Sequence, residues 1–259
     1  MPRPRSRSSF EAQTSISKIH RKPVVVVTGG LSGIGAATAV EFAREGACLV
    51  LGDRDMTRTD TLLAEIKSVG GLGIALEVDV RDAMALEHLA VIARENFGGV
   101  DVLVANAGIA EQSSAASGDP ARWKDVIETN LLGTLYAVRA TLPALVERGG
   151  GHIFVLASLS GRETYVGEPA YIASKWGQVG YAHALRQEVL EHGIRVCLVE
   201  PGLVDTPLAR SNPKVRDLLE EIDALHPDDI ARAIVYAWRQ PEHVVISELA
   251  IRPLRQRPF

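Results

Sequence analysis

Short apolar runs alternate with longer amphipathic stretches along most of the chain. Residues 24–27 are all valine and are soon followed by glycines, a pattern typical of a buried strand. Residues 33–45 then place apolar side chains at the helical period. The same pattern predicts strands at 48–51, 73–78, 100–105, 152–157, 194–199 and 243–249, and helices near 57–69, 82–96, 120–147, 169–191 and 227–239. Apolar strands separated by helices indicate one doubly wound parallel sheet of about seven strands, covered on both faces.

The length of 259 residues favours a single large domain, which we place at 23–259. Residues 1–22 contain six basic side chains and one acidic one, and they lack apolar periodicity. We expect this extension to be disordered, because it cannot bury enough surface to offset the entropy cost of ordering. An organelle transit peptide has a similar composition.

Composition narrows the range of partners. The net charge of −4 argues against nucleic acid, and no apolar run approaches the roughly 18 residues of a membrane span. The histidines show no metal-ligand spacing, so we expect no metal. Cys48 and Cys197 lie in apolar contexts, which predicts two buried free thiols and a reducing, cytoplasmic location.

A glycine-rich loop at 28–35 follows the first predicted strand and opens the first predicted helix. Glycines allow the backbone to approach a pyrophosphate, and the helix N-terminus offers unpaired N–H groups to it. Asp53 ends the second strand, where a carboxylate can accept hydrogen bonds from a ribose diol and repel a 2′-phosphate. This predicts NAD as the cofactor. Arg54 can grip a 2′-phosphate, so NADP stays open.

Tyr171 and Lys175 stand four residues apart at the start of a predicted helix, so both lie on one face. A nearby ammonium favours phenolate, so we expect Lys175 to lower the pKa of Tyr171 toward the working pH. Such a phenol can take a proton from an alcohol or give one to a carbonyl. Ser158 follows the fifth strand, at the sheet edge where active sites of open α/β folds gather.

Together these segments resemble the short-chain dehydrogenase/reductase family in its compact form of about 250 residues. The resemblance covers nearly everything from residue 24 to the last strand and implies a Rossmann-type fold. It implies a catalytic group of four residues, Asn130, Ser158, Tyr171 and Lys175. It implies cofactor contacts from Gly29, Ser32, Gly33, Ile34, Gly35, Asp53, Arg54, Asp79, Val80, Asn106, Ala107, Gly108, Tyr171, Lys175, Pro201, Gly202, Val204 and Thr206.

Roles also come from the resemblance. Asp79 is implied to bind adenine, and 106–108 to stabilise the sheet and line the nucleotide site. Asn130 is implied to hold a water that relays protons to the lysine. The Ser-x-x-Gly pattern selects Ser158 over Ser160 as the catalytic serine. The Pro-Gly loop at 201–202, with Thr206, is implied to contact the nicotinamide.

The sequence departs from the family in two places. Residues 246–253 lack the glycines common in members that make fatty acids or modify steroids. That ending is similar to a subgroup acting on small hydroxy acids, amino-acid alcohols and diverse carbonyls. Glu200 replaces an asparagine common before Pro-Gly, a change with no expected consequence. The predicted pocket walls, 109–117, 162–168 and 203–225, mix apolar and charged residues. Arg162 and Arg210 are either solvated there or available to a substrate carboxylate.

The expected activity is hydride transfer between a nicotinamide cofactor and a secondary alcohol or ketone, with Tyr171 as acid/base. An NADP-dependent carbonyl reductase with the same four residues is the first alternative. A nucleotide sensor without catalysis is the second.

Two long predicted helices carry more apolar residues than one sheet-facing stripe needs. These are Leu131, Leu135, Val138 and Leu142 in one, and Trp176, Val179, Tyr181, Leu185 and Val189 in the other. A helix that is apolar over much of its girth needs a second covering surface, so we expect a homodimer or homotetramer. Packing within one subunit is the alternative.

Overall fold

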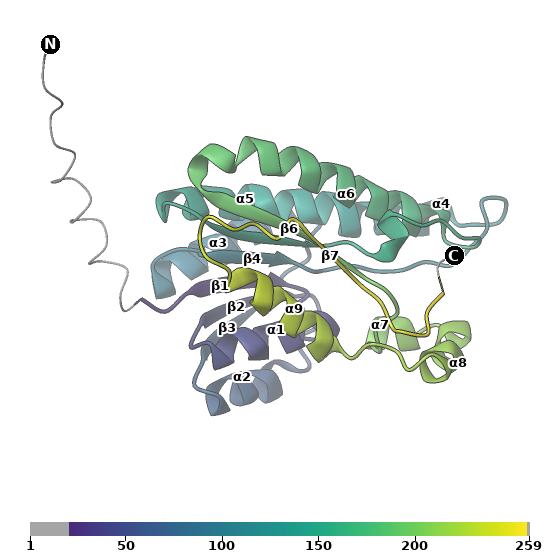
Figure 1. The fold of residues 1–259 in the computed structure, drawn as a ribbon, viewed down its shortest axis with the longest axis horizontal. Coiled ribbons are helices and arrows are strands. Elements are labelled where there is room, and N and C mark those ends of the chain that lie inside the picture. Colours follow the sequence, from purple (N-terminus) through teal and green to yellow (C-terminus); the bar gives the residue numbers. More distant parts are fainter. Residues whose placement is uncertain (1–20, 258–259) are drawn as a thin grey trace, which may run out of the picture.

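The structure is a computed structural model that describes residues 21–257 (Figure 1). The predicted disordered extension therefore lies outside the described residues, apart from its last two positions. Arg21 pairs there with Asp101, which also accepts the N–H of Val24 at 2.8 Å. The first strand is thus anchored at its start.

Seven parallel strands form one sheet in the order β3-β2-β1-β4-β5-β6-β7. Their bounds are β1 (Val24–Thr28), β2 (Cys48–Asp53), β3 (Leu72–Glu77), β4 (Val102–Ala105), β5 (Gly151–Leu156), β6 (Ile194–Pro201) and β7 (Glu248–Ile251). The predicted Rossmann-type sheet is confirmed. The strand order reverses between β1 and β4, and ligands of such sheets bind beyond the strand ends at this switch point.

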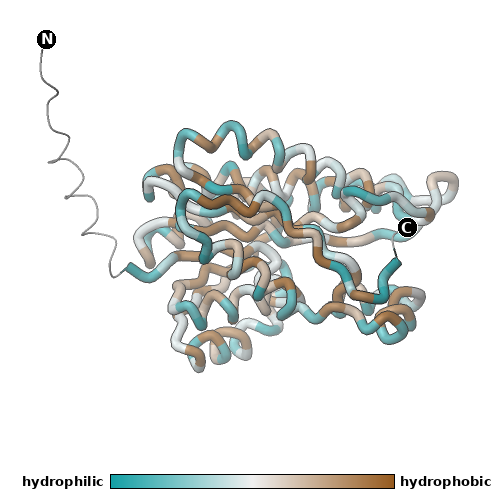
Figure 2. The backbone as a smooth tube through the Cα atoms, in the orientation of Figure 1, coloured by the Kyte–Doolittle hydropathy of each residue, from teal (hydrophilic) through white to brown (hydrophobic). Residues whose placement is uncertain are grey.

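Helices cover both faces of the sheet (Figure 1). One layer contains α1 (Gly33–Arg44), α2 (Thr59–Ser68) and α9 (Pro227–Trp238), and the other contains α3 (Ala83–Phe97), α5 (Gly133–Glu147) and α6 (Pro169–Glu188). Side chains alternate along a strand, so Val24 and Val26 enter the α3–α5–α6 core while Val25 and Val27 enter the opposite one. Figure 2 shows the apolar colour concentrated along the central strands.

The long helix predicted at 120–147 is divided into three parts. It consists of α4 (Pro120–Val126), a π-helical segment η1 (Ile127–Leu132) and α5. The π turn inserts an extra residue per turn, which changes the direction in which Asn130 points without ending the helix. Residues 203–225, treated only as pocket wall in the sequence analysis, contain α7 (Pro207–Arg210) and α8 (Pro213–Glu221), each with proline in its first turn.

The last strand begins later than the sequence pattern predicts. It was expected at 243–249, whereas β7 is Glu248–Ile251. The preceding carbonyls are bound by guanidinium groups: Arg195 donates to Trp238, Gln240 and Val244, and Arg186 donates to Ser247. These bonds hold 240–247 in an irregular path.

Two absences hold for residues 21–257. No helix there is long and apolar enough to cross a membrane. No three His, Cys, Asp or Glu side chains of this stretch gather as a metal site. Cys48 and Cys197 are both free and buried.

Candidate active site

A cleft opens at the carboxyl ends of β1 and β4, at the reversal of strand order. Most of the residues predicted to contact a cofactor line it: Gly29, Ser32, Gly33, Ile34, Asp53, Arg54, Asp79, Val80, Asn106, Ala107, Gly108, Tyr171, Lys175, Pro201 and Thr206. Gly35, Gly202 and Val204 were predicted contacts but are not among its lining residues. Gly35 and Gly202 each directly follow a lining residue in the chain.

Gly35 supports the glycine loop through close packing. A Cβ at this position would lie 2.0 Å from the carbonyl oxygen of Gly29, so only glycine lets α1 start so near the loop. The Asn106 amide nitrogen donates to the same carbonyl at 2.9 Å and to that of Thr28 at 3.1 Å. The Ser32 side chain makes no capping hydrogen bond. The first N–H groups of α1 are therefore open to an anion in the cleft.

Asp53 is held at the end of β2 in a defined orientation. Its Oδ2 accepts the N–H of Leu31 at 2.9 Å, and its Oδ1 accepts that of Asp55 at 3.2 Å. Arg54 lines the same part of the cleft. Asp79 also lines the cleft and binds Arg81, whose guanidinium holds the pKa of the Asp79 carboxyl below its usual range. At this end the cleft thus presents hydrogen-bond acceptors from Asp53 and Asp79 and one guanidinium from Arg54.

Tyr171 and Lys175 line the other end of the cleft, whereas the other two predicted catalytic residues, Ser158 and Asn130, are not among its lining residues. Tyr171 and Lys175 lie on the first two turns of α6, and the Lys175 Nζ is 5.5 Å from the centre of the Tyr171 ring. Nζ donates to the Leu156 carbonyl at 3.0 Å. Ser158 follows β5 and caps a 3-10 turn, η2 (Leu159–Gly161), by accepting the Ser160 N–H at 3.1 Å.

Burial dominates the ionisation of this group. It raises the pKa of Tyr171 to about 12, although a hydrogen bond with Ser158 opposes the rise. It lowers the pKa of Lys175 to about 7, because the ammonium is only 4% exposed. The prediction that Lys175 brings the pKa of Tyr171 down is therefore wrong for the structure as it stands. Desolvation is the largest cause of the pKa shift at Tyr171 and the cause at Lys175.

Asn130 is fully buried within the π turn. Its Oδ1 accepts the N–H of Ile109 at 2.8 Å, while its amide nitrogen donates to the Ile109 carbonyl and to Ser174. It therefore ties the loop after β4 to α6. A Cβ on Gly108 would meet the Asn130 oxygen at 3.3 Å and the Lys175 Nζ at 3.8 Å, so both groups border the same loop.

Several lining residues were missed by sequence reasoning. They are Asp55, Val78, Thr129, Leu156 and Ala157. All but Leu156 directly precede or follow a predicted site residue, so their neighbours in the chain were the available signal. Ile109, Pro207 and Leu208, which also line the cleft, had been predicted only as parts of the pocket wall.

The two arginines considered for a substrate carboxylate are both paired. Arg210 binds Asp205, and Arg162 binds Glu200 and Glu248. Glu200, expected to be of no consequence, is completely buried. Both arginines are thus exposed and also ion-paired.

Comparison with known proteins gives consistent matches. A family model described as short chain dehydrogenase matches residues 23–217. An uncharacterised oxidoreductase of Staphylococcus saprophyticus is 36% identical over 232 residues, covering 89% of this chain and 97% of that protein. A glycine betaine reductase of Emericella nidulans is 35% identical over 256 residues, 95% of this chain, and the match spans 20% of that protein's length.

A solved structure agrees in fold and in length. An alcohol dehydrogenase from the archaeon Thermococcus sibiricus, complexed with 5-hydroxy-NADP, matches with a TM-score of 0.84 and 30% sequence identity. The match covers 92% of this chain and 100% of that one.

Proposed function

The chain belongs to the short-chain dehydrogenase/reductase family, and we propose that it transfers a hydride reversibly between a secondary alcohol and a nicotinamide cofactor. One observation carries the proposal: Ser158 hydrogen-bonds Tyr171, and Tyr171 and Lys175 line one end of a cleft whose other end presents Asp53 and the open N-terminus of α1. That separation suits a dinucleotide lying across the switch point.

The cleft residues fit such a cofactor. The N–H groups at the start of α1 would hold the pyrophosphate, because Gly35 lets the helix begin close to the loop. Asp53 would accept the adenosine ribose hydroxyls, and Lys175 those of the nicotinamide ribose. When bound, the oxidised cofactor would supply a hydride acceptor and a positive charge.

The chain's own residues handle the proton. In alcohol oxidation, Tyr171 takes the proton of the substrate hydroxyl as the hydride leaves the carbon that bears this hydroxyl. Ser158 hydrogen-bonds the substrate oxygen and stabilises its developing charge. Lys175, when protonated, would place a cation 5.5 Å from the centre of the Tyr171 ring, where it would favour the phenolate during proton transfer. In the reverse direction the protonated Tyr171 donates to a ketone oxygen.

We propose NAD as the preferred cofactor. The Asp53 carboxylate faces the cleft at the end of β2 and would repel a 2′-phosphate. An NADP-dependent carbonyl reductase is the second candidate, favoured by Arg54 in the cleft wall. The similar archaeal enzyme was solved with an NADP derivative.

A substrate panel tests the activity. Secondary alcohols and hydroxy acids are incubated with the protein and NAD or NADP, and formation of the reduced cofactor is followed by absorbance. We expect turnover of at least one class of secondary alcohol, faster with NAD. Binding of neither cofactor would overturn the proposal.

A further inference from the structure

Glu200 is an unusual residue for the interior of a sheet. It lies near the end of β6, directly before Pro201, and its side chain is completely buried. Burial raises the pKa of this carboxyl, and the Arg162 guanidinium opposes that rise. A buried carboxylate is costly unless it is paired, so the pair with Arg162 is a requirement of this position.

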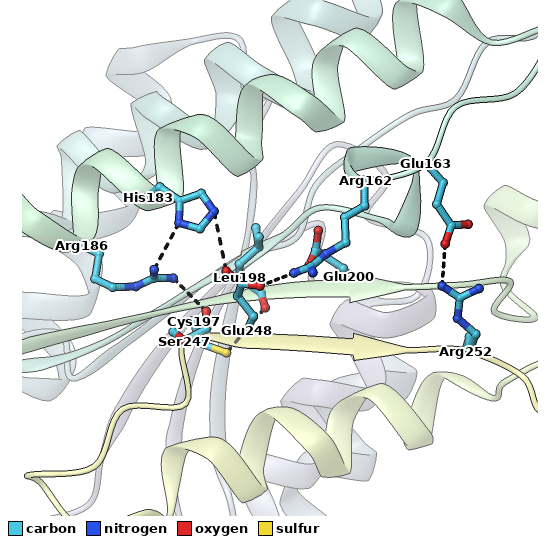
Figure 3. Close-up of polar contacts among 10 residues, drawn as sticks. All are labelled: Arg162, Glu163, His183, Arg186, Cys197, Leu198, Glu200, Ser247, Glu248 and Arg252. Carbon is cyan, nitrogen blue, oxygen red and sulfur yellow. Dashed lines mark hydrogen bonds and ion pairs between the residues drawn. The ribbon is translucent and has the colours of Figure 1, made fainter. Parts of the chain in front are cut away.

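Arg162 connects the segment after β5 to β6 and to β7 through two ion pairs (Figure 3). It directly follows η2, whose first residue is capped by Ser158. Its guanidinium binds Glu200 on β6 and also Glu248 on β7, and it holds the pKa of Glu248 below the usual range. The loop that carries the catalytic serine is thereby fixed to the ends of two strands.

The backbone after Glu200 is fixed by the C-terminal segment. The N–H of Gly202 donates to the Ile251 carbonyl at 2.7 Å, and the N–H of Leu203 donates to the Gln256 Oε1 at 2.9 Å. A Cβ on Gly202 would lie 2.2 Å from that oxygen, so the loop sits directly on the glutamine. Gln256 is 8% exposed, whereas nearby Leu254 is fully exposed. The C-terminal segment therefore buries the polar side chain of Gln256 and leaves the apolar side chain of Leu254 exposed.

A second ion pair reinforces the connection. The Arg252 guanidinium donates to Glu163 at 2.7 Å, so both residues that follow η2, Arg162 and Glu163, are tied to the last strand and its extension (Figure 3). The Pro201–Gly202 loop and the Ser158 loop are therefore both seated on residues 248–256.

We infer that Arg162 and Gln256 are positioning residues that hold the Pro201–Gly202 loop against the nicotinamide half of the cofactor site. The inference rests on the proposed function. Binding and hydride transfer both depend on placing the ring to within about 0.5 Å, and loops keep such precision only when neighbouring groups fix them. The C-terminal segment is thus a working part of the site, although it lies outside the cleft lining.

Three variants of glutamine test the inference by binding. Gln256→Leu removes the acceptor and keeps the side-chain size, and Gln256→Glu retains an oxygen at the same position. Gln240→Leu is the control, because the Gln240 side chain donates only to the Tyr236 carbonyl of α9. Dissociation constants are measured for NADH and for ADP-ribose, which lacks the nicotinamide ring. Thermal unfolding checks that each variant is folded.

The expected result is selective. Gln256→Leu leaves the Leu203 N–H without its partner, so NADH binding weakens about tenfold while ADP-ribose binding changes less than twofold. Gln256→Glu and Gln240→Leu bind both ligands like the wild type. Equal effects on the two ligands, or none on either, would overturn the inference. A wild type that binds neither ligand would instead overturn the proposed function.

Arg162 is tested in the same way with a compensating pair. Arg162→Met leaves the buried Glu200 carboxylate without its partner. We therefore expect NADH binding to weaken about tenfold or more, and ADP-ribose binding to weaken much less. Adding Glu200→Gln removes that charge without restoring the anchor, so the affinity for NADH stays low. If the double variant regains the NADH affinity of the wild type, the unpaired charge alone weakened binding, and Arg162 is not a positioning residue. If Arg162→Met does not fold, the glutamine variants decide.

Discussion

The Lys175 ammonium lies 5.5 Å from the centre of the Tyr171 ring and is anchored by a 3.0 Å hydrogen bond to the Leu156 carbonyl. Burial lowers the pKa of Lys175 to about 7 and raises that of Tyr171 to about 12. The lysine is therefore placed where a cation would aid the phenol, at a cost to the stability of the fold.

That cost is measurable. The pKa of Lys175 falls on folding, so the unfolded state binds more protons between pH 7 and 10.5, and stability drops as pH falls through this range. Lys175→Met removes the buried charge, and we expect it to be about 1 to 5 kcal/mol more stable than the wild type at pH 7. Denaturant unfolding at pH 7 and pH 10 measures the gain, which should shrink at the higher pH. A less stable variant would contradict this.

The buried His152 is expected to make the stability of the fold sensitive to acid. It is buried in β5, stacks on Phe154, and neither ring nitrogen has a hydrogen-bond partner among residues 21–257. Burial lowers its pKa from 6.5 to about 3, so the unfolded state binds the extra proton as pH falls below 6.5. This histidine should cost about 2 kcal/mol of stability between pH 6.5 and 5.

The comparison uses His152→Leu, with the exposed His192→Leu as the matched control. The His152 variant should lose less stability than the wild type between the two pH values, and the control should not differ from the wild type. Parallel pH profiles for all three proteins would show that His152 is not responsible.

The Asp53 carboxylate is expected to determine the preference for NAD over NADP. Asp53→Ala removes the carboxylate that would bind the ribose diol and that also holds the Leu31 N–H. We expect NAD binding to weaken about tenfold, and NADP binding to improve because Arg54 then meets no opposing charge. Titration of both cofactors into wild type and variant measures the ratio. Tighter binding of NADP by the wild type would reverse the proposed preference.

Fewer of the apolar residues on the two long helices are available for subunit contacts than the sequence suggested. Val138, Leu185 and Val189 are buried within the subunit's own core, whereas Trp176 is 48% exposed on α6. We still expect self-association over α5 and α6, with a mass in light scattering at least twice the 27.9 kDa of one chain. Trp176→Glu should shift the mass toward one chain. A wild-type mass near that of one chain would reject the prediction.

The sequence was sufficient for the sheet and for most of the cleft. Valine runs and helical periods identify the strands and helices, and parallel strands bring their carboxyl ends together, so Asp53, Asn106 and Ser158 converge by topology alone. The π turn at Asn130 was not foreseeable, because its residues fit the helical period equally well.

Long-range pairing was also beyond the sequence. Arg162 binds carboxylates 38 and 86 positions away, and only the packing of β5, β6 and β7 brings them together. The same holds for the pKa directions of Tyr171 and Lys175, because desolvation depends on how much chain surrounds a group. Spacing alone overstated the attraction between them.

The most direct test of the account is the Tyr171→Phe variant, which removes one hydroxyl and keeps the ring. Cofactor affinity and turnover are measured together, with the best substrate found in the panel. We predict NADH binding within about twofold of the wild type, and turnover lower by about 10²- to 10⁴-fold, because the proton of the substrate hydroxyl loses its acceptor. Turnover equal to that of the wild type would contradict the assignment of Tyr171 as the acid/base.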